Sequence, residues 1–187
     1  MNDTLTTIYR RNSVRAYKDE QVPEETIKEV IGAGFHAACG LNAQATRFAV
    51  VSDKKKIKEY SDKGKKLFIE MMEASGNDIS GLKNILDNND NIFYGAPAVI
   101  FVFTAPDAMT PLEDASLAIG NMMIAARSLG LGTCWIGFAA ALSSDPDFVK
   151  ETKSEGLKHQ GTMILGYPAK EQKPTPRSEV KIISWIK

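Results

Sequence analysis

The sequence predicts an α+β sandwich, in which a central sheet carries helices on both faces. Expected helices and strands are mixed along the 187 residues, without the strict alternation of a doubly wound parallel sheet. Gly130 and Gly132 follow an expected helix and lack the third glycine of a dinucleotide-binding fingerprint. The length suits one domain over residues 1–187, and neither a repeat nor a low-complexity linker divides it.

Two helices are expected ahead of the first strand. A short one covers residues 3–9. A stronger one begins at Pro23, because proline suits the first helical turn and the acidic Glu24 and Glu25 favour the positive helix end. This helix is expected to stop at Gly40. Its apolar residues recur at the three-to-four spacing of one buried face: Ile27, Val30, Ile31, Gly34, Phe35 and Ala38.

The middle of the chain alternates between strand and helix signals. Residues 47–51 predict a strand. Residues 54–60 predict a short polar helix, and residues 64–74 predict a second, separate helix. Residues 75–91 are rich in Gly, Asn and Asp, which indicates an excursion with a short helical piece around residues 82–86.

A buried strand and a strongly apolar helix follow. Residues 98–104 form a continuous β-branched and aromatic run, typical of a strand buried on both faces. Thr110, Pro111 and Glu113 match a capping box at a helix start. The body of this helix, residues 115–129, is apolar nearly all round. Protein is therefore expected to cover every side of it, either because the helix is central or because it lies in a dimer.

The C-terminal part predicts three strands and a helix. Residues 133–138 and 162–166 are expected strands, and residues 145–152 an expected helix between them. Residues 179–185 predict a last strand. Because it follows a proline-rich crossing, this strand is expected to lie away from the main body.

Composition narrows the classes of function. Lys and Arg total 23, and Asp and Glu also total 23, so nothing indicates nucleic-acid or anionic-membrane partners. The longest apolar run, residues 96–103, is too short to cross a bilayer, and the N-terminal residues lack a secretory signal pattern. Cys39 and Cys134 have neither disulfide-framework nor metal-ligand spacing. We therefore expect no metal site, two free thiols and a cytoplasmic protein.

Basic residues gather in two segments far apart in the sequence. Residues 10–15 carry three arginines and a serine, and Lys173 and Arg177 lie near the C-terminus. Guanidinium groups match phosphate oxygens in charge and geometry. Together with the glycine-rich residues 130–137, these segments indicate a site for a phosphorylated, ring-bearing cofactor. The alternative is that each is an ordinary exposed basic run.

These motifs, in this order, resemble those of the nitroreductase family of FMN-dependent oxidoreductases. The resemblance extends from Arg10 to about Arg177. It comprises the basic segment 10–17, Asn42-Ala43-Gln44, Phe93-Tyr94-Gly95-Ala96-Pro97, the helix 114–129, the glycine-rich residues 130–137, and Leu165-Gly166-Tyr167-Pro168 with Arg177.

The resemblance implies a three-layer sandwich with a mostly antiparallel sheet. It also implies a homodimer with two FMN sites at the subunit interface and a C-terminal segment that reaches over the partner. The implied reaction has two half-reactions. NADH or NADPH first gives hydride to flavin N5 and leaves. A small electron-poor acceptor such as a nitroaromatic or quinone is then reduced. Two alternatives stay open: a flavin-binding carrier or redox-responsive protein with little nicotinamide turnover, and a specialised member that dehalogenates substrates or breaks down flavin.

The resemblance also assigns cofactor-binding residues. Arg11 and Ser13 are expected to hold the FMN phosphate, and Arg177 and Lys173 to close over it. Arg15 is expected to reach the ribityl chain or the pyrimidine edge, where a cation stabilises an anionic reduced flavin. The whole set at the phosphate and its segment is Arg10, Arg11, Asn12, Ser13, Lys173 and Arg177.

Four further residues are implied around the ring. Asn42 and Gln44 are expected to bond ribityl and ring atoms, since amide side chains both donate and accept; the alternative is a turn residue and an exposed glutamine. Ile136 and Gly137 are expected to place backbone beside flavin N5, or else form an ordinary strand end. Many relatives carry Pro and a bulky residue after the Gln, whereas this chain has Ala45, which predicts a more open pocket wall. No side chain is expected to act as a catalytic acid.

Overall fold

The structure, a computed structural model, describes residues 2–76, 78–88, 90–170 and 173–187. Helices and strands alternate irregularly, as expected. In chain order they are α1 (Asp3–Arg10), α2 (Glu24–Phe35), η1 (Gly40–Asn42), β1 (Thr46–Val51), α3 (Lys54–Ala74), α4 (Ser80–Asp87), β2 (Ala98–Thr104), α5 (Pro111–Ser128), β3 (Gly132–Trp135), η2 (Phe138–Ser144), α6 (Pro146–Thr152) and β4 (Lys158–Gly166).

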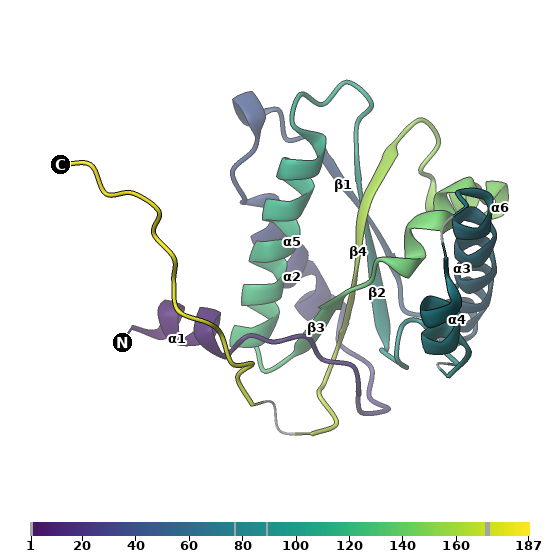
Figure 1. Ribbon diagram of the computed structural model, residues 1–187, viewed down its shortest axis with the longest axis horizontal. Helices are drawn as coiled ribbons and strands as arrows, with labels where there is room; N and C mark the ends of the chain where they lie inside the picture. Colours follow the sequence, from purple (N-terminus) through teal and green to yellow (C-terminus); the bar gives the residue numbers. More distant parts are fainter. Residues whose placement is uncertain (1, 77, 89, 171–172) are drawn as a thin grey trace.

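The four strands form one antiparallel sheet in the order β1-β2-β4-β3. Figure 1 shows α2 and α5 on one face of this sheet and α3, α4 and α6 on the other. The predicted α+β sandwich with helices on both faces is therefore confirmed. Within the described residues, no helix has the length and hydrophobicity needed to cross a membrane.

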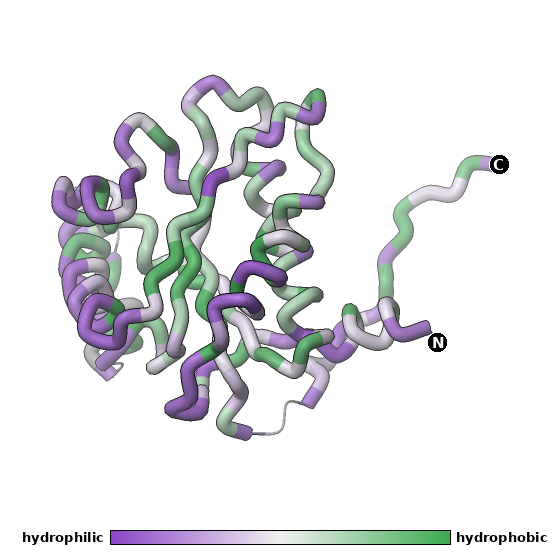
Figure 2. The backbone as a smooth tube through the Cα atoms, turned by 180° about the vertical axis from the view of Figure 1, so that it is seen from behind, coloured by the Kyte–Doolittle hydropathy of each residue, from purple (hydrophilic) through white to green (hydrophobic). Residues whose placement is uncertain are grey.

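Strand β2 lies at the centre, and all seven of its residues are buried, as its apolar run predicted. Successive side chains in a strand point to opposite faces. Val99, Phe101 and Phe103 accordingly join the core under α3, while Ile100 and Val102 join the core under α2 and α5. Figure 2 shows hydrophobic colouring on the central strands and again on the C-terminal tail, outside the body.

The predicted break between residues 60 and 64 is wrong, because α3 is one continuous helix from Lys54 to Ala74. Glycine costs a helix about 1 kcal/mol relative to alanine, which favours a break on local grounds. Gly64 is nevertheless buried within the helix, and a Cβ there would lie 3.2 Å from Ile92 and 3.3 Å from Leu142. Tertiary packing therefore outweighs local propensity at this position.

Other helix boundaries also differ from prediction. The capping box at Thr110 does not form, because its hydroxyl donates to Asp114 Oδ1 at 2.8 Å and no helix N–H bonds to it. Helix α2 ends at Phe35, ahead of the predicted stop at Gly40. Strand β3 ends at Trp135, three residues early. Strand β4 begins at Lys158 because its N-terminal half still pairs with β2.

Two predictions about buried surface are wrong for a single chain. Protein does not cover every side of α5, since Leu117 is 50% exposed. Residues 179–185 form no strand, and Ile183 is fully exposed. A strand needs a neighbouring backbone for its hydrogen bonds, and this tail leaves the body past α1 without meeting one (Figure 1).

Candidate functional site

The N-terminal basic segment runs along the free edge of β3. Ser13 bridges Thr133 in parallel fashion, and the Val14 N–H donates to the Thr133 carbonyl at 2.9 Å. The Tyr17 hydroxyl donates to the Val14 carbonyl at 2.8 Å, and burial raises the pKa of Tyr17. Val14 is buried, whereas Ser13 and Arg15 are exposed. The sheet edge therefore presents alternate residues of this segment to solvent.

A cavity of about 280 Å³ lies at the end of β3, and we call it the ring cavity. It brings together three predicted residues, Arg15, Ile136 and Gly137. The Arg15 guanidinium lies over the Tyr94 ring, 6.0 Å from its centroid. The other lining residues are mainly aromatic or apolar: Ile85, Tyr94, Cys134, Trp135 and Phe138. A flat, largely apolar group with an electron-rich edge suits such a lining.

The backbone at Gly137 is an exposed part of this cavity. No atom lies within 4 Å of the position that a Cβ would take there, and its φ of −74° is ordinary for any residue. The Ile136 N–H already donates to the Thr162 carbonyl at 2.9 Å. In the part of the chain that the structure describes, the Gly137 N–H has no such acceptor. Gly137 is therefore the backbone group that a ligand can reach.

Helix α3 holds the turn that carries Gly137. Phe68 of α3 packs edge-on against Phe138, with ring centroids 5.3 Å apart. At the far end of η2, Lys63 forms an ion pair with Asp145, with Nζ 2.9 Å from the buried Oδ2. Burial raises the pKa of this carboxyl, but Lys63 and the backbone N–H groups of Asp147 and Phe148 together outweigh that effect and hold the pKa below its usual range.

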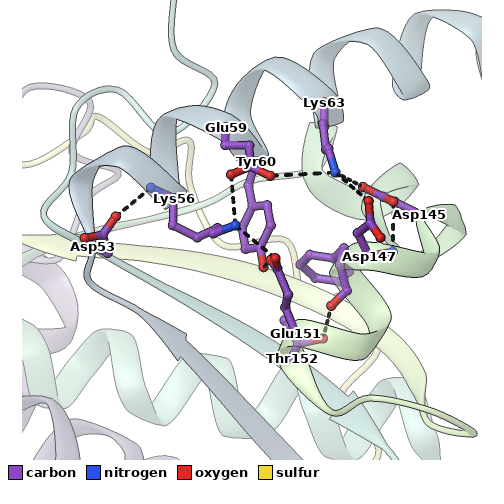
Figure 3. A network of polar contacts seen from close by, with 10 residues as sticks. Asp53, Lys56, Glu59, Tyr60, Lys63, Asp145, Asp147, Glu151 and Thr152 are labelled. Atoms are coloured by element: carbon purple, nitrogen blue, oxygen red, sulfur yellow. Dashed lines mark hydrogen bonds and ion pairs between the residues drawn. The ribbon is translucent and has the colours of Figure 1, made fainter.

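A network of charges extends this attachment to α6 (Figure 3). Lys56 pairs with Glu59 and Glu151, and the Tyr60 hydroxyl donates to Glu151 at 2.5 Å. The hydrogen bond from Tyr60, together with Lys56, holds the pKa of Glu151 below its usual range. The turn at Gly137 is therefore fixed from behind by α3 and α6, while its front is open.

The two basic segments touch, and their joint binding of a cofactor stays a prediction. Asn12 Nδ2 donates to the Lys173 carbonyl at 2.9 Å. Arg11 is the half-buried cap residue of α1, and it directly precedes this contact. Arg177 lies four residues further along the exposed tail, and within the described residues it makes no hydrogen bond or ion pair. Arg10 and Lys173 line a different cavity, beneath α5.

Asn42 and Gln44 are not brought to this site within one chain. Gln44 Nε2 donates to Asn42 Oδ1 at 3.3 Å, ahead of β1. Trp135 of β3 is level with Val50, and three strand spacings separate the two outer strands. Standard sheet dimensions then put Thr46 on the order of 20 Å from Trp135. The site at a subunit interface that the resemblance implies does not require these residues to meet within one chain, so their role stays a prediction.

The loop that carries these amides is strained. Leu41, Asn42 and Gln44 have φ of 50°, 54° and 50°, in the left-handed region that favours glycine. Such residues persist where surrounding structure or a function requires them. The cavity beside Ala38 and Gln44 is only about 10 Å³, so the predicted open wall is not seen in the described part of one chain.

A model of the Nitroreductase family matches residues 8–167. The chain belongs to the nitroreductase family. It is 28% identical to the FMN reductase (NADPH) of Bacillus subtilis (strain 168), over 95% of this chain and 70% of that protein. It is 27% identical to the iodotyrosine deiodinase of Thermotoga neapolitana, over 91% of each chain.

Solved structures of the same family share the fold. A nitroreductase with bound FMN from Desulfitobacterium hafniense DCB-2 is 28% identical, with a TM-score of 0.84 over 98% of this chain and 100% of that one. A nitroreductase with bound FMN from Bacteroides fragilis NCTC 9343 is 27% identical, with a TM-score of 0.82 and the same coverage. The predicted nitroreductase fold is therefore confirmed.

Sequence reasoning missed part of the ring cavity of this nitroreductase-family chain. Ile85 comes from α4, and Trp135 and Phe138 flank Ile136 and Gly137. Trp135 lies inside the glycine-rich residues 130–137 and Phe138 follows them directly, so their position offered a signal. Ile85 lies in the excursion, and only the folded chain shows that α4 reaches the cavity.

The two cysteines and His159 are the remaining polar residues to place in the fold. Cys39 and Cys134 are both free thiols, and Cys134 is buried in the ring-cavity wall. His159 lies against Phe101 and Phe103, and burial lowers its pKa to about 4. Among the described residues, no three His, Cys, Asp or Glu side chains are grouped so that they hold a metal ion.

Proposed function

We propose that this nitroreductase-family oxidoreductase binds FMN, and that it passes hydride from NADH or NADPH to a small electron-poor acceptor such as a nitroaromatic or quinone. FMN, when bound, supplies the atom that accepts and then donates hydride. The observation that carries the proposal is the uncovered backbone at Gly137, which faces a cavity lined by Arg15 and aromatic side chains.

The residues present fit this cofactor. Arg11, Ser13 and Arg177 would hold the phosphate, since charged donors bind phosphate oxygens strongly. Arg15 would lie near the polar edge of the ring, where a cation stabilises negative charge. The Gly137 N–H would donate to the ring, and the missing side chain there lets the backbone approach it.

Proton supply needs no protein acid in this scheme. The described residues that line the ring cavity include no Asp, Glu or His. Water at the open front of the cavity therefore provides the protons that the acceptor needs.

We propose a homodimer, because one chain leaves its site incomplete. Asn42 and Gln44 of the partner subunit would reach the cofactor that Arg11 and Arg15 hold. The exposed apolar residues of α5, Leu112 and Leu117, would then be covered. The tail would reach over the partner and gain the backbone neighbour that it lacks here.

Anaerobic reduction tests this function directly. The purified protein should be yellow, bleach on addition of NADPH or NADH, and regain its colour with a quinone or nitroaromatic acceptor. Stable colour without bleaching would favour the alternative of a flavin carrier. A protein that does not take up FMN would contradict both.

Reductive dehalogenation is a second candidate, favoured by the similarity to a protein named iodotyrosine deiodinase. Reduced protein should then release iodide from an iodinated phenol faster than it reduces a quinone. Release of iodide no faster than from free reduced FMN would remove this candidate.

The cytoplasmic location expected from the sequence stays a prediction.

A further inference from the structure

Residues 40–44, which we call the amide loop, carry the two predicted cofactor residues Asn42 and Gln44. Both side chains are exposed, and the backbone of both residues has positive φ, as has that of Leu41. This conformation costs free energy for residues other than glycine, so neighbouring structure must hold it. The contacts that hold the amide loop therefore decide where the two amides point.

One of these contacts is a buried carboxylate in the first turn of α5. Asp114 Oδ1 accepts a hydrogen bond from the Gly40 N–H at 3.0 Å and another from the Thr110 hydroxyl at 2.8 Å. Asp114 is only 3% exposed, and aspartate is rarely buried unless it is paired. The carboxylate thus ties the start of the amide loop to a helix that begins about 70 residues later in the chain.

The place of Asp114 in its helix does not explain why it is buried. The N-terminal end of a helix favours a negative charge, but Glu113 supplies one in the same turn and stays exposed. Burial of a carboxylate costs free energy, which its hydrogen bonds must offset. The bond to Gly40 is therefore the part of its surroundings that the helix itself does not require.

Gly40 also makes a close contact with the same end of α5. A Cβ on Gly40 would lie 2.3 Å from Thr110 Oγ1, which is nearer than two such atoms can approach, but 3.5 Å from Thr110 Cβ. A side chain at residue 40 would push the amide loop away from Thr110, or the threonine away from Asp114. This close approach and the bond to Asp114 fix the same point of the loop.

The other end of the amide loop is fixed by the sheet. The Arg47 guanidinium donates to the Gln44 carbonyl at 2.8 Å, and the Ala105 N–H donates to the Ala45 carbonyl at 3.1 Å. Strands β1 and β2 therefore set where the loop ends, whereas Asp114 sets where it begins.

We propose that Asp114 is a positioning residue for FMN. Through its bond to Gly40 it sets the direction in which the two amides meet the cofactor. This inference rests on the proposed function, in which these amides reach the FMN held by the other subunit. Within one chain Gln44 Nε2 donates to Asn42 Oδ1 at 3.3 Å, a long hydrogen bond that a ligand can replace. A loop that is held in advance binds more tightly, because less ordering is needed on binding.

Titration of flavin-free protein with FMN tests this role without turnover. Asp114→Ala should weaken FMN binding at least tenfold, because the Gly40 N–H loses its partner. Asp114→Asn should bind within threefold of the parent, since its amide oxygen can still accept both hydrogen bonds. Glu113→Ala is the matched control, because it removes the exposed carboxylate of the same helical turn and should leave FMN affinity unchanged.

A double-mutant cycle separates positioning from a general loss of stability. The reference is Asn42→Ala with Gln44→Ala, which should itself bind FMN at least tenfold more weakly than the parent. In that background Asp114→Ala should cost less than a further threefold, because it acts through side chains that are already absent. A further tenfold loss would show that Asp114 only supports the fold, and would overturn the proposal.

Gly40→Ala tests the same point of the loop without changing the carboxylate. Its Cβ meets the Thr110 hydroxyl, so FMN affinity should fall at least tenfold. Thr110→Ala removes that oxygen, so the pair Gly40→Ala with Thr110→Ala should bind FMN within threefold of Thr110→Ala alone. No loss in Gly40→Ala, or no recovery in the pair, overturns the proposal even where Asp114→Ala does not fold.

The remaining outcomes separate this proposal from the proposed function. Unchanged FMN affinity in Asp114→Ala, or in the variant without the two amides, overturns the positioning role. A protein that shows the expected coupling but does not bleach with NADPH or NADH would keep this role and reject the hydride donor of the proposed function.

Discussion

Two individual arginines, Arg11 and Arg177, are proposed to bind the FMN phosphate. Arg11→Ala and Arg177→Ala should each weaken FMN binding by about 2 kcal/mol, or about thirtyfold, because each removes a charge-assisted contact. Fluorescence titration of flavin-free protein with FMN measures this. Lys158→Ala is the control, since Lys158 is exposed at the start of β4 and does not line the ring cavity. Unchanged FMN affinity in both Arg11 and Arg177 variants would reject the assignment.

The open backbone at Gly137 permits a test that leaves the fold intact. A Cβ there meets no atom within 4 Å beyond its chain neighbours and the backbone angle is ordinary, so Gly137→Val should not lower the unfolding temperature. The valine would instead occupy the ring cavity and weaken FMN binding at least tenfold. Gly32→Val, whose Cβ also meets nothing within 4 Å, is the control for FMN content. A Gly137→Val protein that retains full flavin contradicts the proposed position of the ring.

His159 predicts how stability depends on pH. Burial lowers its pKa to about 4 from an unfolded value of 6.5, so the folded state takes up a proton less readily than the unfolded chain. The free energy of unfolding should therefore fall by about 3 kcal/mol as pH drops from 6.5 to 4, and should not change through this group above pH 7. Urea unfolding across this range measures the slope. His159→Gln should flatten it, whereas the exposed His36→Gln should not.

At the scale of elements, two glycines of α2 make a matched pair. A Cβ at Gly32 meets nothing, so Gly32→Ala should stabilise the protein by about 1 kcal/mol through helix propensity. A Cβ at Gly34 would lie 2.5 Å from Met122 Cγ and 3.1 Å from the Ala118 carbonyl oxygen of α5. Gly34→Ala should therefore lose that gain and destabilise by overpacking. Thermal unfolding of both variants tests whether α2 and α5 pack this closely.

The elements also show what local sequence can predict. Strand β2 matched its predicted bounds because six consecutive apolar residues and a threonine, all buried, favour a central strand strongly. Helix α3 was predicted in two pieces because Gly64 is a local breaker, and only its contact partners far along the chain explain the continuous helix. Ring-cavity residues adjacent to a motif, such as Gly137, were found. Ile85 was not, since α4 reaches the cavity through tertiary packing.

At the scale of the whole molecule, one chain does not bring all the predicted cofactor-binding residues together. The sequence places Asn42 and Gln44 among cofactor ligands, yet the fold puts them at the opposite end of the sheet from Arg15. Sequence order does not reveal whether two residues meet within one subunit or across two. The same limit applies to residues 179–185, whose strand pattern has no partner in one chain.

The exposed tail predicts how the proposed dimer would be held together. Its apolar residues are 62% to 101% exposed, and such surface is stable only when protein covers it: Val180, Ile182, Ile183, Trp185 and Ile186. Removal of residues 178–187 should therefore raise the dimer dissociation constant at least tenfold, as measured by sedimentation at micromolar concentration. Flavin content should fall with it, because Asn42 and Gln44 of the partner subunit would leave the site.

A control in the same tail separates apolar burial from charge. Lys181→Ala with Lys187→Ala removes two cations and keeps every apolar residue, so the dimer should persist. Strand β1 pairs with β2 alone within the described chain, which leaves its other edge free for a backbone neighbour. Amide exchange along β1 should accordingly slow in the full-length dimer and quicken in the truncated chain. A full-length protein that sediments as a monomer would show instead that the tail and the exposed face of α5 serve another partner.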